Sequence, residues 1–159
     1  MKKIKLTQGQ FAIVDDDIYE ELNQYKWHAR KGRSTFYAGR SISAQGKQIL
    51  IQMHRQILGL TDSKIFCDHI NNNGLCNLKY NLRVCTISDN NKNTKPHIGY
   101  TSKYKGVNFH KKSKKWVVQI QIDEKRTHLG LFTNEIEAAK KYDEAAIEHY
   151  GEFANLNFK

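Results

Sequence analysis

The stretch from Cys67 to Cys85 contains the residue types that hydrolysis of a phosphodiester requires. Asp68 and His69 are adjacent, and an asparagine-rich run follows them. Carboxylate and amide oxygens suit a hard divalent cation, which offsets charge on a phosphate, and a histidine of near-neutral pKa can take a proton from water. Neighbouring side chains at a strand end can diverge, so Asp68 can face a metal while His69 faces the water. An Asp-His pair taken alone is more often the start of an ordinary asparagine-rich turn, so the residues around it must decide.

The flanking residues predict a strand, a loop, a second strand and a short helix. Apolar residues before Asp68 indicate a strand leading into it, and Leu82–Val84 indicates a strand that returns. The Asn71–Gly74 run favours a loop, because asparagine and glycine accept turn and left-handed conformations. Thr86 is placed to cap a short polar helix that continues through Asn93.

The rest of the first half reads as short strands and helices. Its acidic run at 15–17 suits a helix N-terminus better than a metal site. A turn is expected near Gln45 and Gly46. The expected elements are a strand at 11–14, a helix at 17–25, strands at 36–40 and 48–53, and a helix at 53–60.

The second half predicts three antiparallel strands covered by one amphipathic helix. The strands begin at 106 and cover 116–122 and 127–132; the helix starts after Thr133 or Asn134 and ends at Gly151. Trp116 and Tyr142 are expected to pack between sheet and helix. This leaves the other sheet face, rich in Lys, Gln, His and Asn, to contact a partner. The fold class is therefore α+β.

A joint between two domains is expected near Pro96, the only proline in the chain. The predicted organisation is a first domain over 1–95 with its core at about 65–95, a linker over 96–102 and a second domain over 103–159.

The charge points to a polyanionic partner. The formal net charge is +10; residues 96–122 contain six lysines and no acid, while residues 133–152 contain six acids. This separation predicts oriented binding to phosphates. The three cysteines, an odd number, read as free thiols. No apolar run approaches the roughly 18–20 residues that span a membrane and no signal peptide is apparent, so a cytoplasmic protein with no membrane partner is expected.

The motifs of residues 53–93 resemble those of the HNH nuclease family, particularly its phage and intron-encoded homing branch. The matching residues are Met53-His54-Arg55, Asp68-His69-Ile70-Asn71, Asn77, Asn81-Leu82-Arg83, and Thr86 with Asn90 and Asn93. The resemblance implies an N-terminal ββα-metal domain that cleaves double-stranded DNA with Mg²⁺ or another divalent cation such as Mn²⁺.

The same resemblance implies a role for each residue. His69 corresponds to the general base, and Asp68 and Asn90 to the metal ligands. Asn81 corresponds to the catalytic asparagine that fixes the loop and orients the histidine. Arg55 and Arg83, like His54, are candidates for phosphate contact, with packing or loop support as the equal alternative.

One position departs from the family pattern. The residue before Asn77 is usually a supporting aspartate, and here it is Cys76. This departure supports the alternative that the chain is a sequence-specific DNA-binding protein with an inactive nuclease remnant.

Residues 103–158 resemble the plant Apetala-two/ethylene-response-factor (AP2/ERF) DNA-binding domain. The matching residues include Tyr104-Lys105-Gly106-Val107, Leu129-Gly130-Leu131-Phe132, Glu137-Ala138-Ala139, Tyr142-Asp143 and Ala154-Asn155-Leu156-Asn157-Phe158. In that family the sheet enters the major groove. The corresponding DNA-contacting positions are Lys105, Asn108, His110, Gln119, Gln121, Arg126 and His128. The plant domains use mainly Arg and Trp there, so base preference does not transfer.

The expected function is a DNA endonuclease whose C-terminal sheet finds the DNA and whose N-terminal finger cuts it. Double-stranded DNA is the expected partner, with no obligate protein partner. An RNA-binding role is less well supported, because the basic strands lack a paired aromatic platform.

Overall fold

The computed structural model describes residues 1–44, 46–95 and 101–158. The chain forms two compact units, Met1–Asn90 and Asn91–Lys159, which are described separately. Residues 96–100 of the predicted linker and Gln45 of the predicted turn lie outside the described residues. Among the described helices, none has the length and apolar character needed to cross a membrane.

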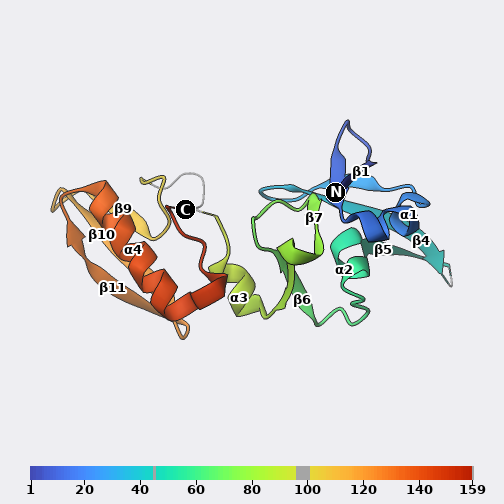
Figure 1. The fold of residues 1–159 in the computed structure, drawn as a ribbon. Helices are drawn as coiled ribbons and strands as arrows, with labels where there is room; N and C mark the ends of the chain where they lie inside the picture. The colour runs from blue at the N-terminus through green and yellow to red at the C-terminus, as the bar shows by residue number, and fades with distance from the viewer. Residues whose placement is uncertain (45, 96–100, 159) are drawn as a thin grey trace. The chain divides into compact units, whose positions relative to one another are not determined.

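The first unit contains three small sheets and short helices (Figure 1). Its sheets have the orders β1-β2-β7, β3-β4-β5 and β6-β8, and the pairing of β2 with β7 is parallel. Its elements are β1 (Lys2–Lys5), β2 (Phe11–Val14), a 3-10 turn (Asp16–Ile18), α1 (Tyr19–Asn23), β3 (His28–Lys31), β4 (Phe36–Ala44), β5 (Lys47–Gln52), α2 (Met53–Ile57), β6 (Phe66–His69), β7 (Cys76–Asn77), a 3-10 turn (Lys79–Asn81) and β8 (Leu82–Cys85), with α3 (Ile87–Lys92) at its end.

The core of the first unit forms around Trp27, which is 1% exposed. Its indole Nε1 donates a hydrogen bond to the carbonyl of Leu22, 2.8 Å away. Apolar side chains from β1, β2, β3, β4 and α2 surround it. The core therefore joins the N-terminal hairpin to the sheet that precedes the Asp68-His69 segment.

The predicted helices of the first unit are shorter than expected. The helix expected at 17–25 is a 3-10 turn followed by α1, which ends at Asn23. The helix expected at 53–60 ends at Ile57, because Gly59 takes a left-handed φ of 66° and reverses the chain. Strands β1, β3 and β7 were not predicted, because they are short; β7 in addition gains its pairing from β2, a distant segment of the chain.

The second unit confirms the predicted three-stranded antiparallel sheet on one helix. It contains β9 (Val107–His110), β10 (Lys115–Ile122), β11 (Lys125–Phe132) and α4 (Glu135–Tyr150), with sheet order β11-β10-β9. The Asn134 side chain caps α4 by accepting from the amides of Ile136 and Glu137. Gly151 ends the helix at a φ of 53°.

Tyr142 and Trp116 pack between sheet and helix as expected. Tyr142 is 3% exposed, whereas Trp116 is half-buried and meets Phe109 edge-on, with ring centroids 4.9 Å apart. The C-terminal tail is fixed by the buried Asp143 carboxylate, which accepts from the amides of Asn157 and Phe158.

Candidate active site and nucleic-acid interface

The Asp68-His69 pair lies at the end of β6, which pairs antiparallel with β8. Both side chains are buried, each 6% exposed. Because successive side chains on a strand point to opposite faces, the two have different neighbours. The strand, loop, strand and helix predicted around this pair are therefore present, with an additional short strand, β7, inside the loop.

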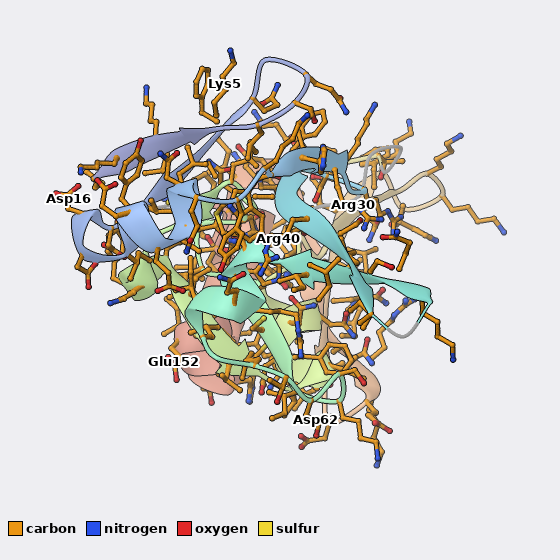
Figure 2. The ribbon with its side chains drawn as sticks, turned by 90° about the vertical axis from the view of Figure 1, so that its right-hand side faces the viewer. Lys5, Asp16, Arg30, Arg40, Asp62 and Glu152 are labelled. Atoms are coloured by element: carbon orange, nitrogen blue, oxygen red, sulfur yellow. The ribbon has the colours of Figure 1, made fainter. Side chains whose placement is uncertain are left out.

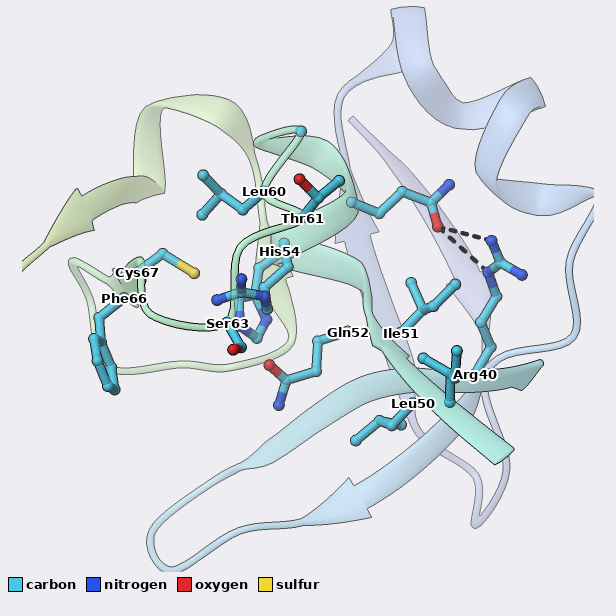
Figure 3. Close-up of a pocket in the computed structure, with 14 residues that line it drawn as sticks. Arg40, Leu50, Ile51, Gln52, His54, Leu60, Thr61, Ser63, Phe66 and Cys67 are labelled. Carbon is cyan, nitrogen blue, oxygen red and sulfur yellow. Dashed lines mark hydrogen bonds between the residues drawn. The ribbon is translucent and has the colours of Figure 1, made fainter. Parts of the chain in front are cut away.

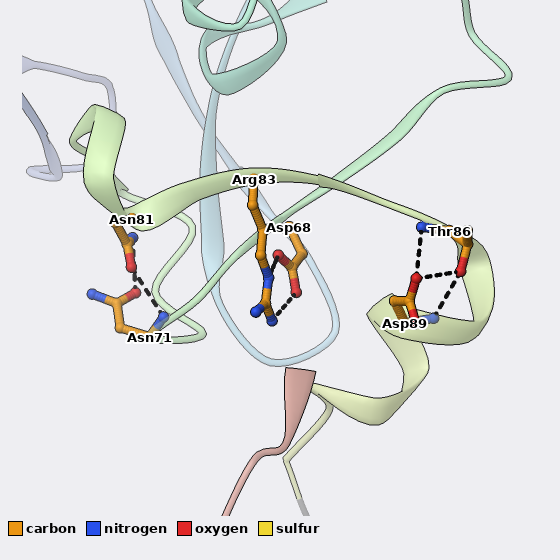
Figure 4. A network of polar contacts seen from close by, with 6 residues as sticks. All are labelled: Asp68, Asn71, Asn81, Arg83, Thr86 and Asp89. Atoms are coloured by element: carbon orange, nitrogen blue, oxygen red, sulfur yellow. Dashed lines mark hydrogen bonds and ion pairs between the residues drawn. The ribbon is translucent and has the colours of Figure 1, made fainter. Parts of the chain in front are cut away.

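Asp68 forms a two-point ion pair with Arg83, its cross-strand partner on β8. Arg83 Nε donates to Asp68 Oδ1 at 2.8 Å, and Nη2 donates to Oδ2 at 3.1 Å (Figure 4). Such a two-point contact fixes the plane of the carboxylate. Arg83 therefore orients Asp68, which is a role distinct from direct contact with a phosphate.

His69 is held in a cluster of rings and an amide. Its Nε2 lies 3.2 Å from Asn77 Oδ1, and its ring centroid is 4.9 Å from that of His54 and 5.9 Å from that of Tyr37. Burial lowers the pKa of His69, although the Asn77 contact and the charge of Asp68 oppose this. The imidazole is therefore neutral at physiological pH, the form that can accept a proton.

Tyr37 is the member of this cluster that sequence reasoning missed. It lies on β4 beside Phe36, in a strand where nothing in the residue pattern distinguishes it from a packing tyrosine. Burial raises its pKa, so its hydroxyl stays protonated. A Cβ added to Gly74 would come within 2.6 Å of the Tyr37 ring, so the loop after His69 lies directly against β4.

His54 lies at the boundary between the ring cluster and a groove. Burial, followed by the charges of His69 and Arg55, lowers the pKa of His54 to about 3, so it is neutral. Its Nδ1 is buried without a hydrogen-bond partner among the described residues, as is Asn77 Nδ2. Unsatisfied buried polar atoms are uncommon and mark places where a bound group or water completes the bonding.

The groove has a volume of about 850 Å³ and lies between β5, α2 and the segment leading to β6 (Figure 3). Leu50, Gln52, Leu60 and Phe66 line it together with His54. Arg55 supports one wall, because its guanidinium donates to the carbonyls of Asp62 and Ile65, each at 2.6 Å. The structure thus gives Arg55 the loop-supporting contact that the sequence left as an alternative.

Asn81 fastens the loop between β6 and β8. It is 2% exposed, and its Nδ2 donates to the main-chain carbonyl of Cys76 at 2.7 Å and to Asn71 Oδ1 at 3.1 Å. Its Oδ1 accepts from the Asn71 amide at 3.0 Å (Figure 4). The presence of Cys76 in place of the expected aspartate does not disturb this hydrogen bond, because Asn81 donates to the main-chain carbonyl of residue 76 and not to its side chain.

Replacing Asn81 by alanine is expected to reduce the free energy of unfolding of the first unit by about 2–3 kcal/mol, because the Cys76 carbonyl loses its partner in a buried place. Urea unfolding followed by tryptophan fluorescence would measure this. Asn71→Ala is the matched control, since it leaves the Cys76 bond in place and should cost about 1 kcal/mol or less. Equal stability of Asn81→Ala and the wild type would show that the Asn81 hydrogen bonds do not stabilise the loop.

Asn90 lies on α3, whose start is fixed by a reciprocal cap. The Asp89 amide donates to Thr86 Oγ1 at 3.1 Å, and Thr86 Oγ1 donates to Asp89 Oδ2 at 2.7 Å (Figure 4). This confirms Thr86 as the capping residue. The Asn90 amide donates to the Thr86 carbonyl, so Asn90 occupies the first full turn of the helix.

The donor set fits a hard divalent cation. Asp68 and Asn90 offer carboxylate and amide oxygens, and Mg²⁺ is commonly held by one or two protein oxygens together with water and phosphate. Within residues 1–44, 46–95 and 101–158, no group of three or more His, Cys, Asp or Glu could hold a metal.

The second unit gathers most of the predicted DNA-contacting residues on the sheet face opposite α4. Gln119 pairs with His128 and Gln121 with Arg126 across β10 and β11, and cross-strand partners share a face. The register between β10 and β11 shifts after Val118, and this shift brings Gln119 opposite His128 and Gln121 opposite Arg126. Gly130, the partner of Val118, takes a φ of 136° at this irregularity. The face defined by these pairs, the β9–β11 face, consists of Asn108, His110, Lys115, Val117, Gln119, Gln121, Arg126, His128 and Leu131.

His110 lies at one end of the β9–β11 face, whereas Lys105 lies outside the face. His110 is exposed at the end of β9, where its Nδ1 lies 2.8 Å from the Ser113 hydroxyl. Lys105 precedes β9 and is half-buried, with its Nζ donating to the carbonyl of Lys92. Burial lowers the pKa of Lys105 to about 8. The structure therefore does not group Lys105 with the other predicted contacts.

The geometry and the sequence relationships together define the class of protein. The chain belongs to the HNH endonuclease family. It is 33% identical over 158 residues to an uncharacterized HNH endonuclease of Acanthamoeba polyphaga mimivirus, and the match covers 94% of this chain and 76% of the viral protein.

A second similarity covers only part of the chain. Over 61 residues it is 41% identical to the APETALA2-like protein 2 of rice, in both the indica and japonica subspecies. The match covers 37% of this chain and 14% of the rice proteins. No family model matches the chain, and no solved structure matches it.

Proposed function

We propose that the chain is a metal-dependent endonuclease that hydrolyses phosphodiester bonds in double-stranded DNA and is directed to its target by the β9–β11 face. The observation that carries this proposal is the pair of buried side chains at the end of β6, a neutral His69 beside Asp68, with Asn81 fastening the loop next to them. Family membership supports the reaction class, and the AP2-like segment supports DNA as the partner.

In this proposal His69 acts as the general base. Its neutral ring accepts a proton from the attacking water, and the Asn77 contact and the Tyr37 and His54 rings fix its orientation. The Asn77 oxygen can only accept a hydrogen bond, so the contact requires the imidazole proton on Nε2 and leaves the basic lone pair on Nδ1.

Asp68 and Asn90 are the residues that would hold Mg²⁺ or Mn²⁺. When bound, the cation supplies charge neutralisation for the phosphate and the leaving oxygen. Arg83 keeps the Asp68 carboxylate oriented through its two-point contact. Asn81 acts as a positioning residue, because it fixes the loop that follows His69.

The alternative is a DNA-binding protein with an inactive nuclease remnant. Two observations favour it: the aspartate expected before Asn77 is Cys76, and both oxygens of Asp68 are already engaged by Arg83.

Cleavage-site mapping on both strands of a DNA library in Mg²⁺ would separate the two. The proposal predicts cuts at reproducible positions within the DNA that the protein enriches. Enrichment of the same DNA with both strands intact would establish the remnant instead.

The amide side chains of the β9–β11 face predict that individual residues recognise individual bases of the DNA target. Gln121 is exposed on this face, and an amide can bond to both edge atoms of adenine in the major groove. We expect Gln121→Ala to cost about 1–3 kcal/mol at one base position of the preferred site. Selection from random duplexes would show relaxed preference at that position alone. Gln24→Ala is the control, because it changes an exposed glutamine of the first unit outside the β3–β5 sheet, and an unchanged consensus for Gln121→Ala would contradict the assignment.

A further inference from the structure

The longest stretch of the chain without an acidic residue lies in the first unit. Residues 22–61 contain seven Lys and Arg residues and no Asp or Glu, so this 40-residue segment carries an uncompensated positive charge. Its cations are Lys26, Arg30, Lys31, Arg33, Arg40, Lys47 and Arg55. A segment of this length with one sign of charge is a footprint of a polyanionic partner.

Within this segment, β3, β4 and β5 form a sheet with one face in the core and the other mostly exposed, except at Tyr37, Gly39 and Gln52. The buried face contributes Ala29, Ala38 and Ile51 to the core or its edge. Cross-strand partners share a face. The mostly exposed face, called the Tyr37 face, consists of His28, Arg30, Tyr37, Gly39, Ser41, Ser43, Gln48, Leu50 and Gln52.

The Tyr37 face is continuous with the candidate active site. The Tyr37 ring contacts that of His69, and Arg30 lies directly opposite Tyr37 on β3. Arg30 also crosses β4: its Cδ is 3.1 Å from the position that a Cβ on Gly39 would occupy. The missing side chain at Gly39 therefore lets a cation lie across the sheet next to the ring cluster.

The cations divide into internal and exposed groups. Arg40 is on the buried face, stacked 3.9 Å over the Tyr25 ring and bonded to Gln56, and Arg55 supports the groove wall. The other cations are exposed: Lys26, Arg30, Lys31, Arg33 and Lys47. None of these five forms an ion pair with a carboxylate of the residues that the structure describes. Figure 2 shows the Arg30 and Arg40 side chains in this part of the first unit.

We propose that the Tyr37 face, with Arg30 on it and Arg33 in the exposed turn between β3 and β4, contacts the backbone of duplex DNA and holds it against His69. This inference rests on the proposed function. Strand β4 has nine residues, a length of about 30 Å at the usual rise per residue, which approaches one turn of a DNA duplex. Ser41, Ser43 and Gln48 supply further neutral donors on this face, and among its described residues no exposed Phe, Tyr or Trp offers a stacking platform for single strands.

The salt dependence of DNA binding tests this surface. Full-length wild type, Arg30→Gln/Arg33→Gln and the control Lys3→Gln/Lys5→Gln, which neutralises two exposed cations of β1, would be titrated onto a labelled duplex without divalent metal. We expect the slope of log Kd against log salt to fall by about 1.8 in the first variant, because each lost phosphate contact contributes about 0.9. The control should change the slope by less than half of that.

A slope in Arg30→Gln/Arg33→Gln equal to that of the wild type overturns the proposal. Arg33→Gln alone, in the exposed turn between β3 and β4, gives an independent reading in case Arg30→Gln disturbs packing over Gly39, and its slope should fall by about 0.9. Displacement of the duplex by an equal concentration of single-stranded RNA would also overturn it. Failure of the proposed function is distinct: a chain that binds with the expected slope but does not cleave contradicts the nuclease assignment only.

Discussion

Replacing His69 by alanine is expected to reduce DNA cleavage by about 10²–10⁴-fold, the usual contribution of a positioned general base, while DNA affinity stays unchanged. The imidazole is buried beside Asp68 and its pKa is lowered, which favours the neutral form that the proposed general base requires. Alanine removes this base but leaves the charged surfaces that bind phosphates. Single-turnover cleavage at saturating protein, with affinity measured separately, separates the two quantities.

His149→Ala is the matched control for this prediction, because His149 is an exposed histidine on α4 with no place in the site. It should cleave as the wild type does. Full activity of His69→Ala would remove His69 from the base position. A parallel loss of cleavage and of affinity would point to a folding defect, which circular dichroism of the same preparation would reveal.

The largest expected effect on stability comes from Gly106→Ala in the second unit. Gly106 has a φ of 77°, and an added Cβ would lie 1.9 Å from Cδ2 of Tyr142 and 2.8 Å from the Gln119 carbonyl oxygen. The left-handed backbone costs about 1–2 kcal/mol and overpacking about 1–3 kcal/mol. Together these are a large share of the stability of a small unit, so we expect it to unfold at physiological temperature and lose sequence-specific binding.

Gly151→Ala separates strain from steric clash. Gly151 also has a positive φ, 53°, but nothing lies within 4 Å of its added Cβ. It should lose only about 1 kcal/mol. Thermal unfolding followed by near-ultraviolet circular dichroism, which reports the Trp116 and Tyr142 environments, measures both variants. Equal stabilities of Gly106→Ala and Gly151→Ala would contradict the packing at Tyr142.

Local signals in the sequence were sufficient for the second unit. The alternation around Trp116 and the Asn134 cap are properties of residues close together in the chain, and the structure has them where they were expected. The Asp68-His69 strand end and the Thr86 cap were predicted for the same reason. Predictions of this kind do not require knowledge of contacts between distant segments of the chain.

The sequence could not show contacts between distant segments. Tyr37 reaches His69 from 32 residues earlier in the chain, and nothing near it marks that role. Cross-strand pairing decides that Arg83 meets Asp68, whereas the motif alone left its role open. Burial of the Lys105 ammonium against the Lys92 carbonyl likewise depends on how the segment before β9 folds back. The residue roles carried over from the family therefore remain predictions for mutagenesis.

Incubation of supercoiled plasmid with the full-length protein in Mg²⁺, with and without a chelator, tests the central claim most directly. We predict conversion of the plasmid to nicked or linear DNA in Mg²⁺, no conversion with the chelator, and recovery when excess Mg²⁺ is added back. Plasmid that stays supercoiled in Mg²⁺ and in Mn²⁺, at concentrations where the protein is shown to bind it, would contradict the account and establish a DNA-binding protein with an inactive nuclease site.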